Sequence, residues 1–228
     1  MLFSSTIAHT ILLTIARILA YFPTITFSGY LQAWLEKKMG DDTGEQMGLM
    51  SLNPMVHFNI LGFIFLLFFG WGWGSRDNLT PQRCAYFPRH RFGYLMCMFA
   101  RPTAHFILLI AGLCFMIILG GLFYQTPIMT MLHGNPTLIT VLREIVMAFL
   151  MLNLLSVALY FMMSLFMLFM LRYSDQLRVH TEYADFILLA LFIVVWLILA
   201  PYIQFILFWL LALVEQSIRF LVLYLFEK

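Results

Sequence analysis

Long apolar runs alternate with short polar segments along this chain. The apolar runs cover 6–35, 58–74, 94–123, 141–171 and 184–226. An α-helix needs about 20 apolar residues to cross a bilayer, so every run except 58–74 is long enough to span one. The last run is long enough for two spans joined near Pro201, or for one span and an interfacial helix. The pattern therefore predicts an all-α polytopic membrane protein, a single integral membrane domain over residues 1–228 with about five membrane-spanning helices.

Basic residues indicate which loops share a side of the membrane, because Lys and Arg are biased to cytoplasmic loops. The polar segments 36–56, 75–93 and 172–183 all carry Lys or Arg, whereas 124–140 carries neither. The first three are therefore predicted on the cytoplasmic side and the fourth outside. Segment 58–74 then begins and ends on the same side, so we expect it to be re-entrant or to lie in the interface. A re-entrant segment is tolerated where it is buried in protein or lines a wet cavity.

The composition narrows the class of protein further. Hydrophobic residues make up 63% of the chain and charged residues 11%, whereas a soluble domain is roughly 25% charged. These values exclude a soluble globular domain, a disordered chain and a nucleic-acid-binding protein. The cysteines Cys84, Cys97 and Cys114 lack the spacing of a zinc or redox pair, so we expect free thiols. We expect an integral membrane protein, in a bacterial inner (cytoplasmic) membrane.

Residues 28–62 carry turn-forming residues at a spacing that matches a known family. The stretch contains Gly40-Asp41, Thr43-Gly44, Gly48, Ser51-Leu52-Asn53-Pro54, His57 and Gly62. Without a gap, it resembles the opening of the site-2 protease family, which reads H-E-x-x-H, then G-D-x-T-A, then T-L-N-P-x-x-H and a closing Gly. Members of that family are zinc metalloproteases that cut peptides inside the membrane. The resemblance implies a site-2-protease-like bundle of helices with a re-entrant segment.

Later positions extend the resemblance over most of the chain. Phe69-Gly70-Trp71-Gly72 is similar to the F-G-W that follows the family's re-entrant segment, and Ala100-Arg101-Pro102 to its A-G-P. Asn153-Leu154-Leu155 is similar to the N-x-x-L that opens its last catalytic helix. The resemblance thus implies a set of structural motif residues: Gly40, Asp41, Asn53, Pro54, His57, Gly62, Gly70, Trp71 and Pro102.

The residues that carry the family's chemistry are replaced. In the family, two His at i and i+4 bind zinc and the Glu beside the first His is the general base. Ser28 and Gln32 occupy the two His positions, Gly29 occupies the Glu position, and Leu168 stands about where the third ligand, an Asp, would be. A catalytic zinc needs about three protein ligands. We therefore expect no catalytic residues, no metal and no cofactor by this mechanism.

The leading hypothesis is a catalytically inactive relative, a pseudoprotease that acts as a scaffold or accessory subunit. Its partners would be other integral membrane proteins, within a complex, together with lipids, and no nucleic acid. The first alternative is an active intramembrane protease of altered mechanism, with Ser28 or His57 in a new role. The second is a transporter subunit, which the scarcity of ionisable residues within the spans disfavours.

Polar residues inside the predicted spans have more than one interpretation. Arg101 and His105 lie early in a span, where they would anchor it at the interface or contact a lipid phosphate or a partner carboxylate. Asn153 would form an interhelical hydrogen bond or contact a partner. His57 would bond to backbone near the re-entrant segment, with a metal ligand as the alternative.

Overall fold

The structure, a computed structural model, describes residues 2–75, 90–125 and 137–177, with scattered helical positions between 198 and 224. Every regular element in this part is a helix, and the elements are α1 (Leu2–Lys38), α2 (Thr43–Gln46), the 3-10 helix η1 (Pro54–His57), α3 (Ile60–Phe69), α4 (His90–Met98), α5 (Ala100–Gln125) and α7 (Thr137–Leu177). Within this described part of the chain, three stretches are long and apolar enough to cross a membrane: Thr10–Lys38, Ala100–Ile117 and Val141–Leu165. The chain is an all-α membrane protein, as predicted. Apart from the scattered positions, the predicted run 184–226 lies outside the described residues.

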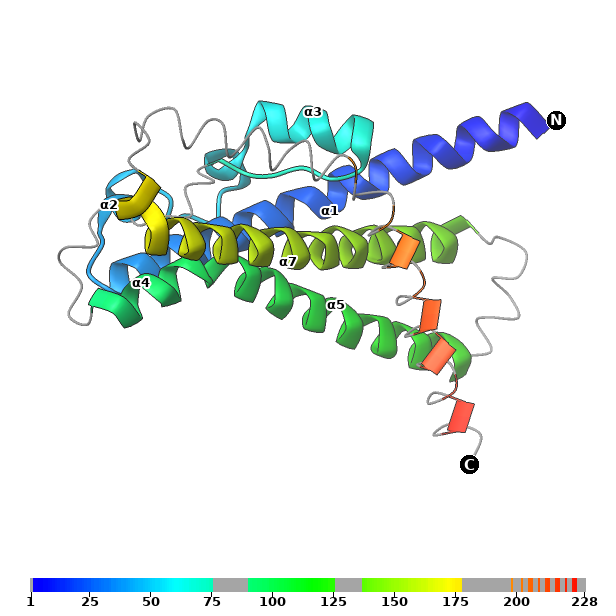
Figure 1. Cartoon of the computed structure of the whole chain (residues 1–228). Helices are drawn as coiled ribbons and strands as arrows, with labels where there is room; N and C mark the ends of the chain where they lie inside the picture. Colours follow the sequence, from blue (N-terminus) through cyan, green and yellow to red (C-terminus); the bar gives the residue numbers. More distant parts are fainter. Residues whose placement is uncertain are drawn as a thin grey trace.

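The three long helices α1, α5 and α7 pack against one another as a bundle, and each of them contacts the other two. α1 and α7 run in the same direction, while α5 runs against both (Figure 1). The ends at Lys38, Ala100 and Leu177 therefore lie at one end of the bundle, and Gln125 and Thr137 lie at the other. This is the same grouping of chain segments that the basic residues predict.

Two prolines shape the bundle in different ways. We expect Pro23 to kink or break the first span, but α1 continues through it without a break. In contrast, the predicted run 94–123 is divided at Phe99 into α4 and α5. Pro102 has no N–H to donate to the carbonyl of Met98, and that carbonyl accepts instead from the Ser164 hydroxyl of α7 at 2.8 Å. The end of α4 is thereby tied to α7.

Residues 58–74 form a hairpin whose two ends meet. Its first limb is α3, which begins after Asn59, whose side chain accepts from Gly62 N, and ends at Gly70 with φ of 75°. The second limb returns to Ser75, whose N–H donates to the His57 carbonyl at 2.6 Å. Ten residues of helix extend only about 15 Å, too short to cross a bilayer. The hairpin therefore has the geometry that a re-entrant segment requires, and its depth in the bilayer stays a prediction.

Close backbone contact holds the two limbs of the hairpin together. A Cβ added to Gly62 would lie 2.0 Å from the Trp73 carbonyl oxygen, and one added to Gly72 would lie 2.0 Å from the Gly62 oxygen. The hairpin packs on α1 through Tyr21, which is fully buried and whose hydroxyl donates to the Trp73 carbonyl at 2.7 Å. Trp71 Nε1 donates to Ser156 of α7 at 3.1 Å. The hairpin is thus fixed to two of the three long helices.

Candidate functional site

The chain leaves α1 through a tight turn that the motif residues build. Gly40 adopts φ of 102°, a conformation that favours glycine, and ends the helix after Lys38. The buried Asp41 carboxylate accepts from the Thr43 backbone N–H at 3.0 Å and from the Thr43 hydroxyl. The turn therefore fixes the start of α2, which packs back against α1.

The Asn53-Pro54 pair starts the next element in the same way. The Asn53 side chain accepts from Met55 N at 3.0 Å, and Pro54 occupies the first turn of η1, where a missing N–H costs nothing. η1 ends at His57, which is buried. The motif residues of this loop therefore form caps and turns, and together they place His57 against α1.

His57 lies against the backbone of α1 in one defined orientation. Its Nε2 donates to the Ser51 carbonyl at 2.7 Å, which leaves Nδ1 as the unprotonated nitrogen. Nδ1 is buried and has no hydrogen-bond partner in the part of the chain that the structure describes. Burial lowers the pKa of His57 below its usual 6.5, and the charge of Arg101 lowers it further, while the Ser51 hydrogen bond opposes both. His57 is therefore a neutral imidazole at neutral pH.

The ring of His57 covers Gly29, where the resemblance places a catalytic Glu. A Cβ added to Gly29 would lie 2.3 Å from His57 Nδ1, so no larger side chain fits there unless the ring moves. Ser28 is buried, and its hydroxyl donates back to the Ile25 carbonyl at 3.3 Å. Position 28 thus holds a hydroxyl that is hydrogen-bonded within its own helix, and position 29 holds a residue without a side chain.

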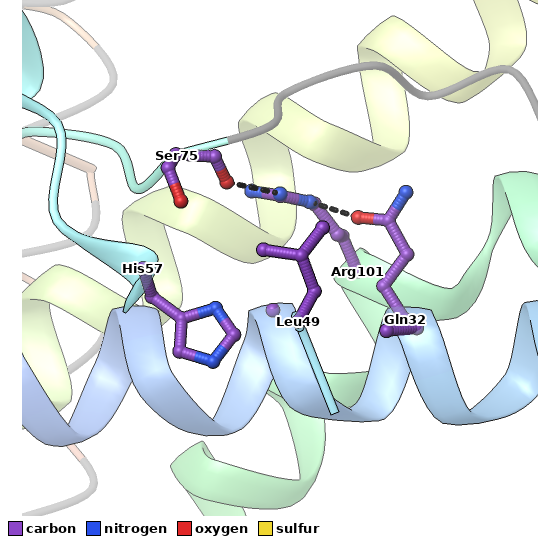
Figure 2. A pocket seen from close by; sticks show the side chains of 7 residues that line it. Gln32, Leu49, His57, Ser75 and Arg101 are labelled. Carbon is purple, nitrogen blue, oxygen red and sulfur yellow. Dashed lines mark hydrogen bonds between the residues drawn. The ribbon is translucent and has the colours of Figure 1, made fainter. Parts of the chain in front are cut away.

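Arg101 binds to Gln32, where the resemblance places the second zinc-binding His. Its Nε donates to Gln32 Oε1, Nη1 donates to the Tyr160 hydroxyl at 3.2 Å, and Nη2 donates to the Ser75 carbonyl at 3.3 Å. Figure 2 shows the guanidinium between Gln32 and Ser75, with His57 and Leu49 in the same pocket. Gln32 also donates to Glu36 at 3.0 Å, so it links the guanidinium to a buried carboxylate. This pocket has no space for a water molecule.

The structure buries Arg101 inside the bundle, where we expected an interfacial anchor or a contact to lipid or a partner. Arg101 and His105 are each 2% exposed and Asn153 is fully buried. His105 Nδ1 donates to Asn153 Oδ1 at 3.0 Å, and the Asn153 amide donates to the Thr24 hydroxyl at 3.2 Å. Asn153 therefore joins α7 to α5 and α1, as an interhelical hydrogen bond.

Tyr160, and not Leu168, is the α7 residue that reaches the site. The Tyr160 hydroxyl accepts from Arg101, and its ring stacks on His105 with centroids 5.2 Å apart. Leu168 lies two turns farther along α7, about 12 Å away along the helix. The gapless placement of the third metal ligand thus points away from the cluster that forms in the structure.

The donor groups at this site do not fit a zinc ion. Zinc binds Cys, His, Asp and Glu, but the α1 positions present a hydroxyl, no side chain and an amide. The Gln32 oxygen already accepts from a cation, the Arg101 guanidinium. Within the described residues, no group of three or more His, Cys, Asp or Glu is placed to hold a metal ion.

Reasoning from the sequence missed Thr24, Glu36, Ser75 and Tyr160 as members of this cluster. A signal for most of them is present in the helical spacing. Polar residues recur every four positions along the buried face of α1, and at similar spacing on α5 and α7: Thr24, Ser28, Gln32 and Glu36; Arg101 and His105; Asn153, Ser156, Tyr160 and Ser164. In an apolar helix such a stripe marks the face that meets other helices. Ser75 contacts Arg101 only through its backbone carbonyl, and no sequence pattern predicts such a contact.

Comparison with known proteins gives one informative relationship. The chain is 27% identical over 96 residues to a protein of Bacillus subtilis (strain 168) named "Putative zinc metalloprotease YwhC". The match spans 42% of this chain and 42% of that relative. No family model matches the chain, and no solved structure matches it. Together with the membrane-spanning helices, the similarity supports a relation to membrane-embedded zinc metalloproteases of the site-2 type.

Proposed function

We propose that this protein is a catalytically inactive relative of the site-2 proteases that binds other integral membrane proteins as a scaffold or accessory subunit. The observation that carries the proposal is the content of the former catalytic position. Gly29 and Gln32 stand where the family has Glu and His, and they face the His57 ring and the Arg101 guanidinium. A general base and a metal-bound water both need room that this arrangement does not leave.

The retained parts of the family's pattern support a role that needs the shape of the fold. Gly40, Asp41, Asn53 and Gly62 still make the turn, the caps and the close backbone contact that seat the hairpin on α1. Such residues are needed for the architecture and not for bond cleavage. A chain that keeps the architecture without the chemistry is suited to binding, in the inner membrane of a bacterium.

The Ser28 alternative receives no support from the geometry around it. A nucleophilic Ser needs a general base within hydrogen-bond reach, and the Ser28 hydroxyl donates to a backbone carbonyl of its own helix. The partner-binding role is therefore the one function that we propose.

The test is an affinity purification of the tagged full chain from gently solubilised native membranes, with quantification of every protein recovered. The proposal expects a membrane protein at close to one copy per chain. It also expects that neither the wild type nor Ser28→Ala cleaves a membrane-spanning peptide, with or without added zinc. Recovery of the chain alone, or cleavage that Ser28→Ala or His57→Ala abolishes, would contradict it.

A second measurement would locate the partner's contact. A photo-cross-linking residue would replace Phe68 on the exposed face of α3, or Phe106 on α5 as a matched control; they are 79% and 52% exposed. A partner that binds the hairpin would be captured from the first position and not from the second.

A further inference from the structure

Arg101 joins four parts of the molecule that are far apart in the sequence. It belongs to α5, and its guanidinium reaches Gln32 of α1, Tyr160 of α7 and the Ser75 carbonyl at the closing end of the hairpin. The Tyr160 ring adds a further contact, with the guanidinium carbon 5.3 Å from its centroid.

Burial of the Arg101 charge costs free energy unless hydrogen bonds replace its hydration. A cation within a membrane-spanning bundle loses its water shell, and protein acceptors must take the place of that water. Arg101 does not reach toward an interface, since only 2% of it is exposed. Each of the three guanidinium nitrogens instead donates to an oxygen, and the Gln32 amide donates in turn to the buried Glu36. The position is therefore built around the cation.

We propose that the Arg101 guanidinium is a built-in structural cation, which ties α1, α7 and the hairpin together at the position where the resemblance places zinc. A zinc ion connects distant segments because several ligands share one charge. The guanidinium achieves the same connection with donors in a fixed plane, and it needs neutral oxygen acceptors where a metal needs imidazole and carboxylate. Gln32, the Tyr160 hydroxyl and the Ser75 carbonyl are acceptors of that kind.

The proposal explains why the replacements occur together. An imidazolium or a metal ion at position 32 would stand next to the Arg101 charge and be repelled by it. A Glu at position 29 would collide with His57, whose ring closes the same pocket. The cation and the metal are therefore mutually exclusive occupants of this site, and the fold of this chain is independent of metal.

The first test compares wild type with variants in thermal unfolding of the full chain in detergent. Wild type should contain no stoichiometric zinc and keep its Tm when chelator is added. Arg101→Met should lower the Tm by about 10 °C, because it removes the cation that donates to Gln32, Tyr160 and Ser75. Arg101→Lys should recover only part of the loss, since an ammonium lacks the planar fork. The control Arg143→Met removes an exposed Arg of α7 and should change the Tm little.

The second test asks whether the two cations compete. Ser28→His and Gln32→His together create a pair of His at i and i+4. His57 Nδ1, which has no hydrogen-bond partner within the described residues, would be the third nitrogen ligand. With Arg101 present, this double variant should bind Zn²⁺ or Co²⁺ roughly 100-fold more weakly than with Arg101→Met added, because the charges repel. Zinc should also raise the Tm of the triple variant and leave the Tm of Arg101→Met unchanged. The absorbance of bound Co²⁺ gives the affinity directly.

Three outcomes would overturn the proposal. The first is a wild-type chain that holds zinc and loses stability to chelator, which would contradict the proposed function as well. The second is equal metal affinity with and without Arg101, and the third is an Arg101→Met chain as stable as the Arg143→Met control. The second and third outcomes would leave the partner-binding function intact. If the triple variant does not fold, the wild-type chelation result and the comparison with Arg101→Lys decide the question.

Discussion

The two ends of the three-helix bundle are packed in different ways. Around Gln32, Ser75 and Arg101, the helices and the hairpin meet through buried polar groups and leave no space for a water molecule. Toward the other end, the same three helices form an open pocket of about 270 Å³, lined by Leu19, Ala20, Pro23, Ala111, Gly112, Phe115, Ile145, Val146 and Phe149. We refer to these regions as the polar end and the apolar end.

The difference follows from the kind of interaction at each end. A buried polar atom must find a partner at a defined distance and angle, so a polar network fixes the positions of its helices closely. Apolar side chains gain from any contact, and in a bilayer the lipid offers them nearly as much as a neighbouring helix does. The polar end therefore determines how the helices and the hairpin are arranged, and the apolar end tolerates an open pocket between the helices.

The largest effect is expected where backbone meets backbone in the hairpin. Gly62→Ala should destabilise the chain by about 3 kcal/mol or more, because the new Cβ would lie 2.0 Å from a carbonyl that cannot move without opening the hairpin. Gly48→Ala is the matched control, since it meets nothing within 4 Å and suffers only from its φ of 75°. It should cost about 1 kcal/mol. Thermal unfolding followed by Trp fluorescence compares the two, and equal losses would contradict the backbone contact.

A pair of substitutions on α1 tests the comparison directly. Ala33 lines the filled pocket of the polar end and Ala20 lines the open pocket of the apolar end, and both are buried. Ala33→Leu should cost about 1–3 kcal/mol through overpacking, whereas Ala20→Leu should be neutral or stabilise by up to about 1 kcal/mol because the side chain enters the open pocket. The same unfolding assay gives both values. If Ala20→Leu is the more harmful change, the two ends do not differ as described.

A smaller effect is expected for the interhelical bond of Asn153. Asn153→Leu should destabilise the chain by about 1–2 kcal/mol, since His105 Nδ1–H and the Thr24 hydroxyl lose their partner inside the bundle. The control Leu154→Ala on the same helix removes only apolar contact. The double variant Asn153→Leu with His105→Leu should recover part of the loss, because both partners of the bond are then removed together. An additive double variant would show that the two side chains do not interact.

The smallest predicted effect is a dependence on pH from His57. Its pKa is lowered in the folded chain from 6.5, so the unfolded chain takes up a proton at a higher pH than the folded one. The contribution of His57 is therefore fully present above about pH 7 and is lost as the pH falls below 6.5 toward the folded pKa. His57→Gln should flatten the slope of Tm against pH in that window. A slope that is unchanged in this variant would assign the effect to another group.

Local sequence signals determined the helices and turns of this molecule. Apolar runs of spanning length gave the three long helices, and the caps and turns followed from Gly40, Asp41 and the Asn53-Pro54 pair. The same-side position of the two ends of 58–74 could be inferred from the basic residues, and it fits the meeting of His57 and Ser75. These features depend on residues that are close together in the chain, so the sequence contains them directly.

The site itself was only partly within reach of the sequence. Ser28, Gly29 and Gln32 fall within one gapless stretch, so the resemblance alone singles them out as the positions of the metal-binding motif. Arg101 was singled out for its charge but assigned to the interface, because an Arg near the start of a span usually extends its charged end to the membrane surface. Its three acceptors come from different elements, one of them a backbone carbonyl.

What the sequence by itself determined is the class of the protein, its helices, and the residue types at positions 28, 29 and 32, where the resemblance places the metal-binding motif. The tertiary structure decided what lies at these positions: the His57 ring over Gly29 and the Arg101 guanidinium between Gln32, Tyr160 and Ser75. The physical reason is the separation along the chain of the residues that interact. Helix formation and capping are set by neighbours in the chain, whereas a buried charge is satisfied only by groups that folding brings together from distant segments.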